Sequence, residues 1–170
     1  STTSSASDFA KHFSASCPNV VIVNSEKSPQ LNEVFAKLEQ MKKTRPGIAV
    51  TLYGYNQWFV YQDYDLDQFF KYNTYIPSTY YYNKAADKTK ELEAKYTEKY
   101  GEPMSKQYIP RMALTGYDQA EFFIRGLKAH GKNFKGTASE VKYRPLQTRY
   151  DFVRIGQGGY INDHFQLVHF

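Results

Sequence analysis

Residues 19–53 contain two short apolar runs with one amphipathic segment between them. The runs are NVVIVN at 19–24 and IAVTLY at 48–53, and both are rich in residues that favour strands. Between them, apolar residues recur at intervals of three and four, as on the buried face of a helix; they are Leu31, Val34, Phe35, Leu38 and Met41. A strand, a helix and a second strand in this order predict parallel strands joined by a right-handed crossover.

Local signals refine this βαβ prediction. Ser28 and Pro29 supply an N-cap and a proline at the first helical position, and Pro46 with Gly47 stops the helix. The unbroken apolar run at 19–24 predicts a strand that is buried on both faces. The expected fold class is therefore α/β, a three-layer domain with a mainly parallel sheet.

The rest of the chain extends this pattern. Helices are predicted after Ser7, near residues 66–72, and over 86–100 and 110–130. The inner stripe of the last of these helices is expected to be Ala113, Tyr117, Ala120, Ile124 and Leu127. The runs YDFVRI and YINDHFQLVHF, separated by GQGG at 156–159, predict a C-terminal β-hairpin.

The segment YIPSTYYYN at 75–83 contains four tyrosines. Residues 74–82 predict a third strand, and Pro77 places it at an edge or a bend because proline cannot donate to the ladder. We expect Tyr75 to pack inward, while some of Tyr80, Tyr81 and Tyr82 stay partly exposed where the strand gives way to a connection. Exposed rings there would line a ligand site or pair with the same rings of another copy, so a homodimer is one expected assembly.

Composition narrows the classes of function. The chain has 170 residues, the size of one domain, and a net charge of +5, which is too small to indicate a nucleic-acid partner. The tract from Arg125 to Arg149 holds seven basic residues and one acid, Glu140, as expected for a solvated face or, less commonly, an anion site. Cys17 is the only cysteine, which excludes an intrachain disulfide and a cysteine-based metal site.

Residue patterns for covalent or metal chemistry are weak. Asp63, Asp65 and Asp67 have the spacing that begins a calcium loop, but Gln68 and Thr74 stand where glycine and glutamate are required. The histidines have no zinc-like spacing, and neither a nucleophile elbow nor a phosphate-binding loop occurs in the sequence. We therefore expect a binding module with no catalytic residues, no metal and no cofactor rather than an enzyme.

The hydropathy and the first residues of the chain indicate whether it spans a membrane and whether it is part of a longer chain. No run of eighteen apolar residues exists, so no transmembrane segment is expected. Residues 1–7, STTSSAS, are typical of a polar linker or a cut end, which leaves residues 8–170 as one domain of a longer chain.

Several motifs, taken in order, resemble the later part of type 1 periplasmic solute-binding proteins, the branched-chain amino acid and amide binders of ABC transport systems. They are VVIVNSEKSPQLNEVFAKL, TLYGYNQW, YIPSTYYYN, EKYGEPMSKQYIP, TGYDQAEFFIRGLKAHG and YDFVRIGQGGYIN. The tyrosine- and lysine-rich style is similar to versions in Bacteroidetes that follow LysM peptidoglycan-binding repeats. The resemblance implies a periplasmic or cell-envelope location. Family members are about twice as long and have two lobes, so the completeness of a cleft stays open here.

Ligands of open α/β sheets bind beyond the carboxyl ends of the strands. That rule selects Asn24 and Ser25 after the first strand, and Tyr55, Asn56 and Gln57 after the second; Tyr82 of the aromatic segment is a sixth candidate. In the resembling family, the loop matching Gly54-Tyr55-Asn56 often supplies an acid for a ligand's amino group. Its absence here favours a sugar or peptide-like ligand over a free amino acid. Alternatively, Asn24 and Asn56 merely cap turns.

Two functions remain open from the sequence. The first is an extracytoplasmic solute-binding domain for a small polar ligand, such as an amino acid, a peptide or a sugar. The second is a cell-wall-associated interaction module, a partner of LysM repeats, that has lost ligand binding. An unrecognised hydrolase is a more distant third.

Overall fold

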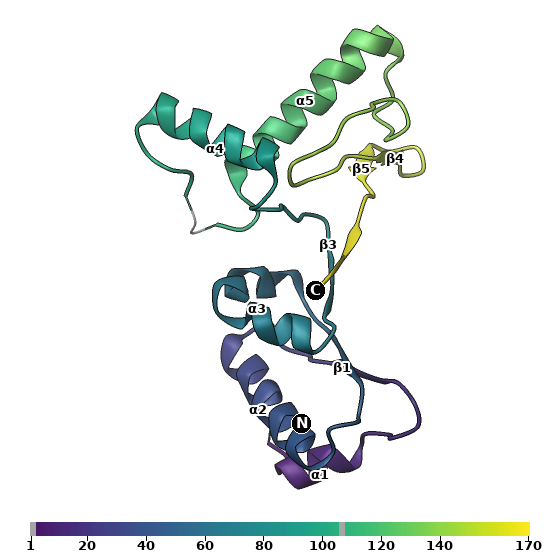
Figure 1. Ribbon diagram of the computed structural model, residues 1–170. Helices are drawn as coiled ribbons and strands as arrows, with labels where there is room; N and C mark the ends of the chain where they lie inside the picture. The colour runs from purple at the N-terminus through teal and green to yellow at the C-terminus, as the bar shows by residue number, and fades with distance from the viewer. Residues whose placement is uncertain (1–2, 106–107) are drawn as a thin grey trace. The chain divides into compact units, whose positions relative to one another are not determined.

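The computed structural model of the protein describes residues 3–105 and 108–170. The chain forms two compact units, each with its own core. Unit 1 comprises the residues up to Pro77 together with Leu167–Phe170, and unit 2 comprises Ser78–Gln166. The chain therefore leaves unit 1 after Pro77 and re-enters it at Leu167 (Figure 1).

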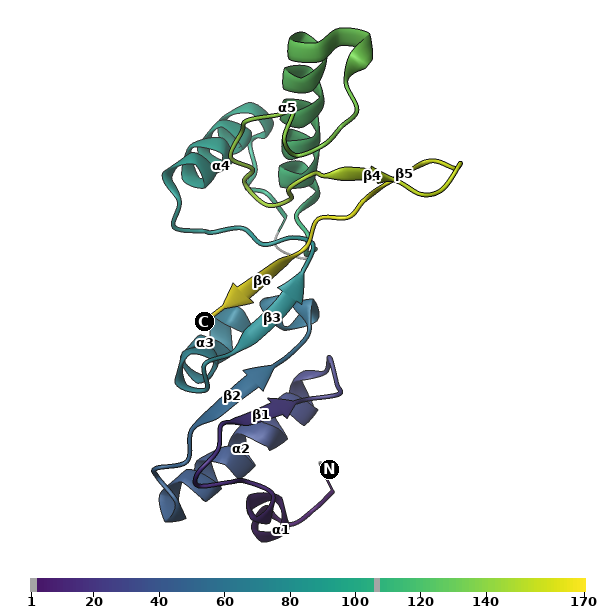
Figure 2. The same cartoon turned by 90° about the vertical axis from the view of Figure 1, so that its right-hand side faces the viewer.

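Unit 1 is built on a four-stranded, mainly parallel sheet in the order β1-β2-β3-β6. Its elements are α1 (Ala6–Lys11), β1 (Asn19–Ile22), α2 (Ser28–Thr44), β2 (Val50–Tyr53), the 3₁₀-helix η1 (Asn56–Tyr61), α3 (Gln62–Lys71), β3 (Tyr75–Ser78) and β6 (Gln166–His169). β1, β2 and β3 are parallel, which confirms the βαβ prediction. β6 runs antiparallel to β3, since the N–H of Phe170 donates to the carbonyl of Thr74 at 3.0 Å (Figure 2).

Both connecting helices, α2 and α3, lie on one face of this sheet (Figure 2). Because β1, β2 and β3 are neighbours in chain order, two successive right-handed crossovers place both connections on the same side. Val20 and Ile22 on the other face are 61% and 69% exposed, so the prediction that residues 19–24 are buried on both faces is wrong. The described part of unit 1 has two layers, not the three expected.

We call the uncovered side of this sheet the open face. Every second residue of each strand lies on it, as the register and the alternating burial show. These residues are Val20, Ile22, Thr51, Tyr53, Tyr75, Pro77, Leu167 and His169. The residues between them point toward the helices and form the core.

The helical face of the sheet is closed by aliphatic and aromatic side chains. All five residues predicted for the inner stripe of α2 are buried, which confirms that prediction. Trp58 stacks on Phe69 at a ring distance of 6.1 Å, and Phe69 in turn contacts Phe170 at 5.4 Å. The C-terminal residue therefore closes the core of unit 1, a contact that no local sequence pattern indicates.

The described residues of unit 2 form two α-helices, a short 3₁₀-helix and a hairpin. Its elements are α4 (Asp87–Tyr100), α5 (Met112–His130), the 3₁₀-helix η2 (Gly131–Asn133), β4 (Phe152–Arg154) and β5 (Tyr160–Asn162). β4 and β5 pair antiparallel, from Phe152 beside Asn162 to Arg154 beside Tyr160, which confirms the C-terminal hairpin. The run predicted as one strand at its end is broken after Asn162, and Gln166–His169 joins the sheet of unit 1 instead.

The buried stripe of α5 differs from the prediction. It consists of Leu114, Asp118, Phe122 and Gly126, spaced by four residues. Ala113 and Tyr117 are half-buried against the core, but Ala120 is exposed, and Ile124 and Leu127 are 65% and 55% exposed. The apolar pattern misleads here because a buried aspartate and a glycine occupy the inner face.

Candidate functional site

The loops that follow β1 and β2 meet at one edge of the unit 1 sheet, because parallel neighbours end on the same side. The hydroxyl of Tyr55 donates to Oδ1 of Asn24 at 2.9 Å, so two of the predicted site residues touch. Ser25 lies in the same loop, where its hydroxyl accepts the N–H of Lys27 at 3.2 Å. The loops that the strand-end rule selected therefore meet in the structure, and their role in ligand binding stays a prediction.

Three aromatic side chains hold the loop after β1 in place. Besides Tyr55, the indole N–H of Trp58 donates to the Ser25 carbonyl at 3.1 Å. The hydroxyl of Tyr61 donates to the Glu26 carbonyl at 3.1 Å and accepts the N–H of Ser28 at 3.2 Å. A 3₁₀-helix has three residues per turn, so positions 55, 58 and 61 fall on one line and face one loop.

Gly54 makes this arrangement possible. A Cβ atom at residue 54 would lie 2.1 Å from the Trp58 ring, so any larger residue would displace the indole. Trp58 is fully buried and reaches the Ser25 carbonyl across that glycine. The sequence analysis missed Tyr61, although the spacing of three aromatic residues at intervals of three was the available signal.

A cavity of about 520 Å³ lies beside the carboxyl end of β1. Its lining combines apolar strand and helix residues with polar ones: Phe9, Val21, Ile22, Val23, Asn24, Ser25, Lys27, Gln30, Val34 and Lys37. Within this lining, Oε1 of Gln30 is buried and has no hydrogen-bond partner among the residues that the structure describes. A buried acceptor without a donor is costly, and a donor on a water or ligand that enters the cavity would satisfy it.

The charges of the cavity are basic or absent. No acidic residue is among the lining residues that the structure describes. The ammonium group of Lys37 is buried and contacts Glu33 at 3.2 Å, while Lys27 is exposed at the rim. The cavity thus offers amide groups, a hydroxyl and lysines to a ligand, but no carboxylate to hold a ligand's amino group.

The remaining predicted site residues lie elsewhere. Asn56 is half-buried and Gln57 exposed in η1, and neither belongs to the cavity lining. Tyr82 is buried in unit 2, where its hydroxyl accepts the Arg111 guanidinium N–H at 2.7 Å and its ring packs under the same cation. Tyr75 is half-buried on the open face, so the expectation that it packs inward is wrong, whereas Tyr80 and Tyr81 are partly exposed as expected. Within the six predicted residues, Asn24 and Ser25 line the cavity.

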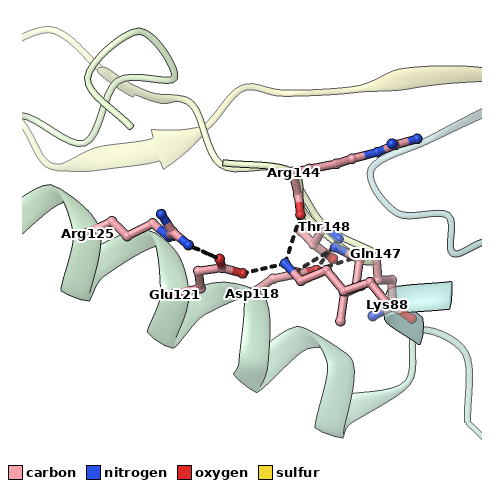
Figure 3. A network of polar contacts seen from close by, with 8 residues as sticks. Lys88, Asp118, Glu121, Arg125, Arg144, Gln147 and Thr148 are labelled. Carbon is pink, nitrogen blue, oxygen red and sulfur yellow. Dashed lines mark hydrogen bonds and ion pairs between the residues drawn. The ribbon is translucent and has the colours of Figure 1, made fainter. Parts of the chain in front are cut away.

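A second polar cluster surrounds α5 in unit 2 (Figure 3). The carboxylate of Asp118 is fully buried and accepts the backbone N–H groups of Leu146, Gln147 and Thr148, each at 2.8 Å. Burial raises the pKa of Asp118 above its ordinary value, and the three backbone donors oppose that rise. With no exposed atom, Asp118 anchors residues 146–148 and does not face a substrate.

The outer part of this cluster is an ion-pair network. Glu121 accepts from Lys88 at 2.9 Å and from Arg125 at 3.0 Å, and Lys88 also donates to the Arg144 carbonyl at 3.3 Å (Figure 3). The network connects α4, α5 and the segment before residue 146. Together with Asp118, it accounts for part of the basic tract as a structural feature of unit 2.

Over residues 3–105 and 108–170, no three histidine, cysteine, aspartate or glutamate side chains gather where they could hold a metal ion. Asp63 and Asp65 lie in the first turn of α3 rather than in a loop. Within the same described residues, no helix has the length and apolar character needed to cross a membrane.

Comparisons with known proteins add no relative to this picture. No family model, no curated protein and no solved structure matches the chain. The candidate site therefore rests on its own geometry.

Proposed function

We propose that this protein is a non-catalytic, extracytoplasmic solute-binding domain, and that the unit 1 cavity binds a small polar ligand. The observation that carries the proposal is the buried, unpartnered Oε1 of Gln30 in a cavity of about 520 Å³. Ligand sites are mostly apolar hollows with a few convergent polar groups, and the cavity has this composition. Its place beside the carboxyl end of a parallel strand is the usual one for α/β sheets.

The lining favours a particular ligand chemistry. With Lys27 and Lys37 present and no acid in the described lining, a free ammonium group would find no counter-charge. A ligand hydroxyl or amide N–H would instead donate to Gln30, and a carboxylate on the ligand would be balanced by Lys27, since Lys37 is already paired with Glu33. We infer a sugar-like or acylated peptide-like ligand, in place of a free amino acid recognised by its amine.

The organisation of the chain also supports membership of the solute-binding class. Such proteins have two lobes linked by crossing segments, and this chain passes between two compact units after Pro77 and again before Leu167. The proposed relation to type 1 periplasmic binding proteins rests on this connectivity and on the sequence motifs. A periplasmic or cell-envelope location is part of the same proposal.

A pair of glutamine variants tests the site. Gln30→Leu removes the buried acceptor, while Gln57→Leu makes the same change at an exposed residue outside the cavity lining. Binding of N-acetylglucosamine, glucose, N-acetylglycine, diglycine and glycine is measured by calorimetry and by the thermal shift of unit 1. We expect one of the first four to bind, and Gln30→Leu to weaken it at least about tenfold, the loss for one buried hydrogen bond.

The same variant has a second expected effect. Without ligand, Gln30→Leu should raise the melting temperature of unit 1, because it removes a buried polar atom that lacks a partner. Gln57→Leu should change neither binding nor stability. If none of the five compounds binds, or if both variants weaken binding equally, the cavity is not the site.

The open face favours a second function, the cell-wall-associated interaction module. Val20, Ile22 and Leu167 on this face are at least half exposed, and exposed apolar patches mark contact surfaces. Co-sedimentation with purified peptidoglycan sacculi tests this function directly. Val20 lies on the open face outside the cavity lining, so retention that Val20→Lys abolishes and Gln30→Leu does not would favour the interaction module over solute binding.

A further inference from the structure

The open face of unit 1 has contributions from all four strands. The register places Val20 beside Thr51 and Ile22 beside Tyr53, and Tyr53 beside Tyr75. The Tyr75 ring stacks on His169 at a centroid distance of 4.2 Å, which continues the row onto β6. The face is thus one continuous surface and not a set of isolated residues.

This surface is apolar where it meets solvent. Ile22 is 69% exposed, Val20 61% and Leu167 51%, and none of its eight residues is an aspartate, glutamate, lysine or arginine. The solvated face of a sheet normally consists of polar and charged residues, which alternate along each strand with apolar residues of the buried face. The composition of the open face is that of a buried layer.

The polar groups at one end of the face already have partners. A ring nitrogen of His169, Nε2, lies 2.6 Å from Oδ1 of Asn73, and Nδ2 of Asn73 donates to the Thr51 hydroxyl at 3.1 Å. Covering the face would therefore leave these three side chains hydrogen-bonded to one another. The cost of removing them from water is correspondingly small.

We propose that two copies of this chain pack open face against open face and form a symmetric dimer with a two-sheet core. A twofold axis places each residue opposite the same set of residues on the partner, so a charged face would repel itself. The open face has no formal charge and meets itself without that repulsion. A nucleic acid or a charged peptide would require opposite charges, which the face lacks.

The size of the face sets the expected affinity. Its eight side chains offer on the order of 500 Å² per copy, so the dimer would bury about 1,000 Å², the lower end of specific interfaces. Interfaces of this size without strong polar anchors correspond to dissociation constants of about 10 µM. The two sheets would lie about 10 Å apart, the usual spacing of packed sheets.

Two isoleucine variants with the same substitution test the interface. Ile22→Lys places a charge on the open face, whereas Ile124→Lys places it on α5 at nearly equal exposure, 69% against 65%. Sedimentation velocity and light scattering across the micromolar range should show twice the 19.8 kDa of one chain. We expect Ile22→Lys to raise the dissociation constant more than about tenfold, the effect of an unpaired buried charge, and Ile124→Lys to leave it unchanged.

Cysteine cross-linking gives an independent readout of the geometry. In a Cys17→Ser background, Tyr53→Cys lies on the second strand of the open face, while Val60→Cys lies in η1, outside the open face. A short bifunctional maleimide should join two chains through position 53 and not through position 60. Circular dichroism of each variant establishes that it is folded.

Several results would overturn the proposal. A monomer at every concentration would do so, as would a dimer that Ile124→Lys breaks and Ile22→Lys leaves intact. A mass that keeps rising with concentration would show open-ended association, for example through the edge of β1, in place of a closed dimer. Cross-linking through residue 60 as readily as through residue 53 would contradict the face-to-face arrangement.

Discussion

Replacing Gly126 by alanine should destabilise unit 2, whereas the same replacement at Gly116 should stabilise it. Both glycines lie within α5. A Cβ atom at Gly126 would lie 2.2 Å from the tip of the Phe134 ring, but a Cβ atom at Gly116 would have no other heavy atom within 4 Å. The two variants therefore differ in one physical respect, the collision with Phe134.

The magnitude follows from two opposing effects. Alanine is better than glycine in a helix by about 1 kcal/mol, and this gain applies at both positions. Forcing a methyl group into a packed site costs about 1–3 kcal/mol. The Phe134 ring cannot move freely, because it contacts Phe122 at 5.5 Å and Phe123 at 6.1 Å. We expect Gly126→Ala to be about 1–3 kcal/mol less stable than Gly116→Ala, since the helix gain cancels in the comparison.

The assay has to report on unit 2. The single tryptophan, Trp58, lies in unit 1, so its fluorescence follows that unit alone. Urea unfolding followed by far-ultraviolet circular dichroism, together with amide hydrogen exchange of peptides from α5, follows unit 2. Gly126→Ala should speed exchange throughout the second half of α5, and Gly116→Ala should slow it.

One outcome would refute the reasoning. If Gly126→Ala is as stable as Gly116→Ala, the Phe134 ring does not rest on the helix backbone at residue 126. The packing of the aromatic cluster around Phe122 would then differ from the one described.

Two further predictions concern buried and partly buried carboxylates. Asp118→Asn should destabilise unit 2 by about 2–3 kcal/mol, because an amide cannot accept all three backbone N–H groups as the carboxylate does. Urea unfolding followed by circular dichroism measures the loss, with Asp163→Asn at an exposed position as the control. Equal stability of the two variants would contradict the prediction. The hydrogen bonds from Lys71 and Tyr72 lower the pKa of Glu39, so its stabilising contribution is present above the ordinary glutamate pKa of about 4.3 and is lost as the pH falls through the lower folded value. The melting temperature of unit 1, followed by Trp58 fluorescence, should therefore fall between about pH 5 and pH 3. The fall should be less steep in Glu39→Gln than in the wild type or in the control variant Glu26→Gln. Parallel curves for all three proteins would exclude a stabilising role of the Glu39 carboxylate.

Local sequence patterns determined much of the secondary structure. A proline in the first turn and apolar spacing of three and four placed α2 and its five buried residues, because those signals act within one helix. The predicted N-cap is wrong by one residue, since Lys27 precedes the helix and Ser28 is its first residue. The glycines of GQGG likewise marked the hairpin of β4 and β5. The rule for parallel strands brought the loops of Asn24 and Tyr55 together, since it depends only on chain direction.

The tertiary structure decided which faces are buried. Residues 20–23 are all apolar, yet Val20 and Ile22 are exposed on the open face, because strand order and crossover handedness put both helices on one side. In α5 the inner face contains Asp118 and Gly126. Asp118 binds the backbone of Leu146, about 30 residues further along the chain, and Gly126 makes room for the ring of Phe134, 8 residues further along. Tyr82 is likewise buried by a contact with a distant residue, since the guanidinium of Arg111 donates a hydrogen bond to its hydroxyl. Contacts between distant residues depend on the path of the whole chain, and local periodicity contains no information about that path.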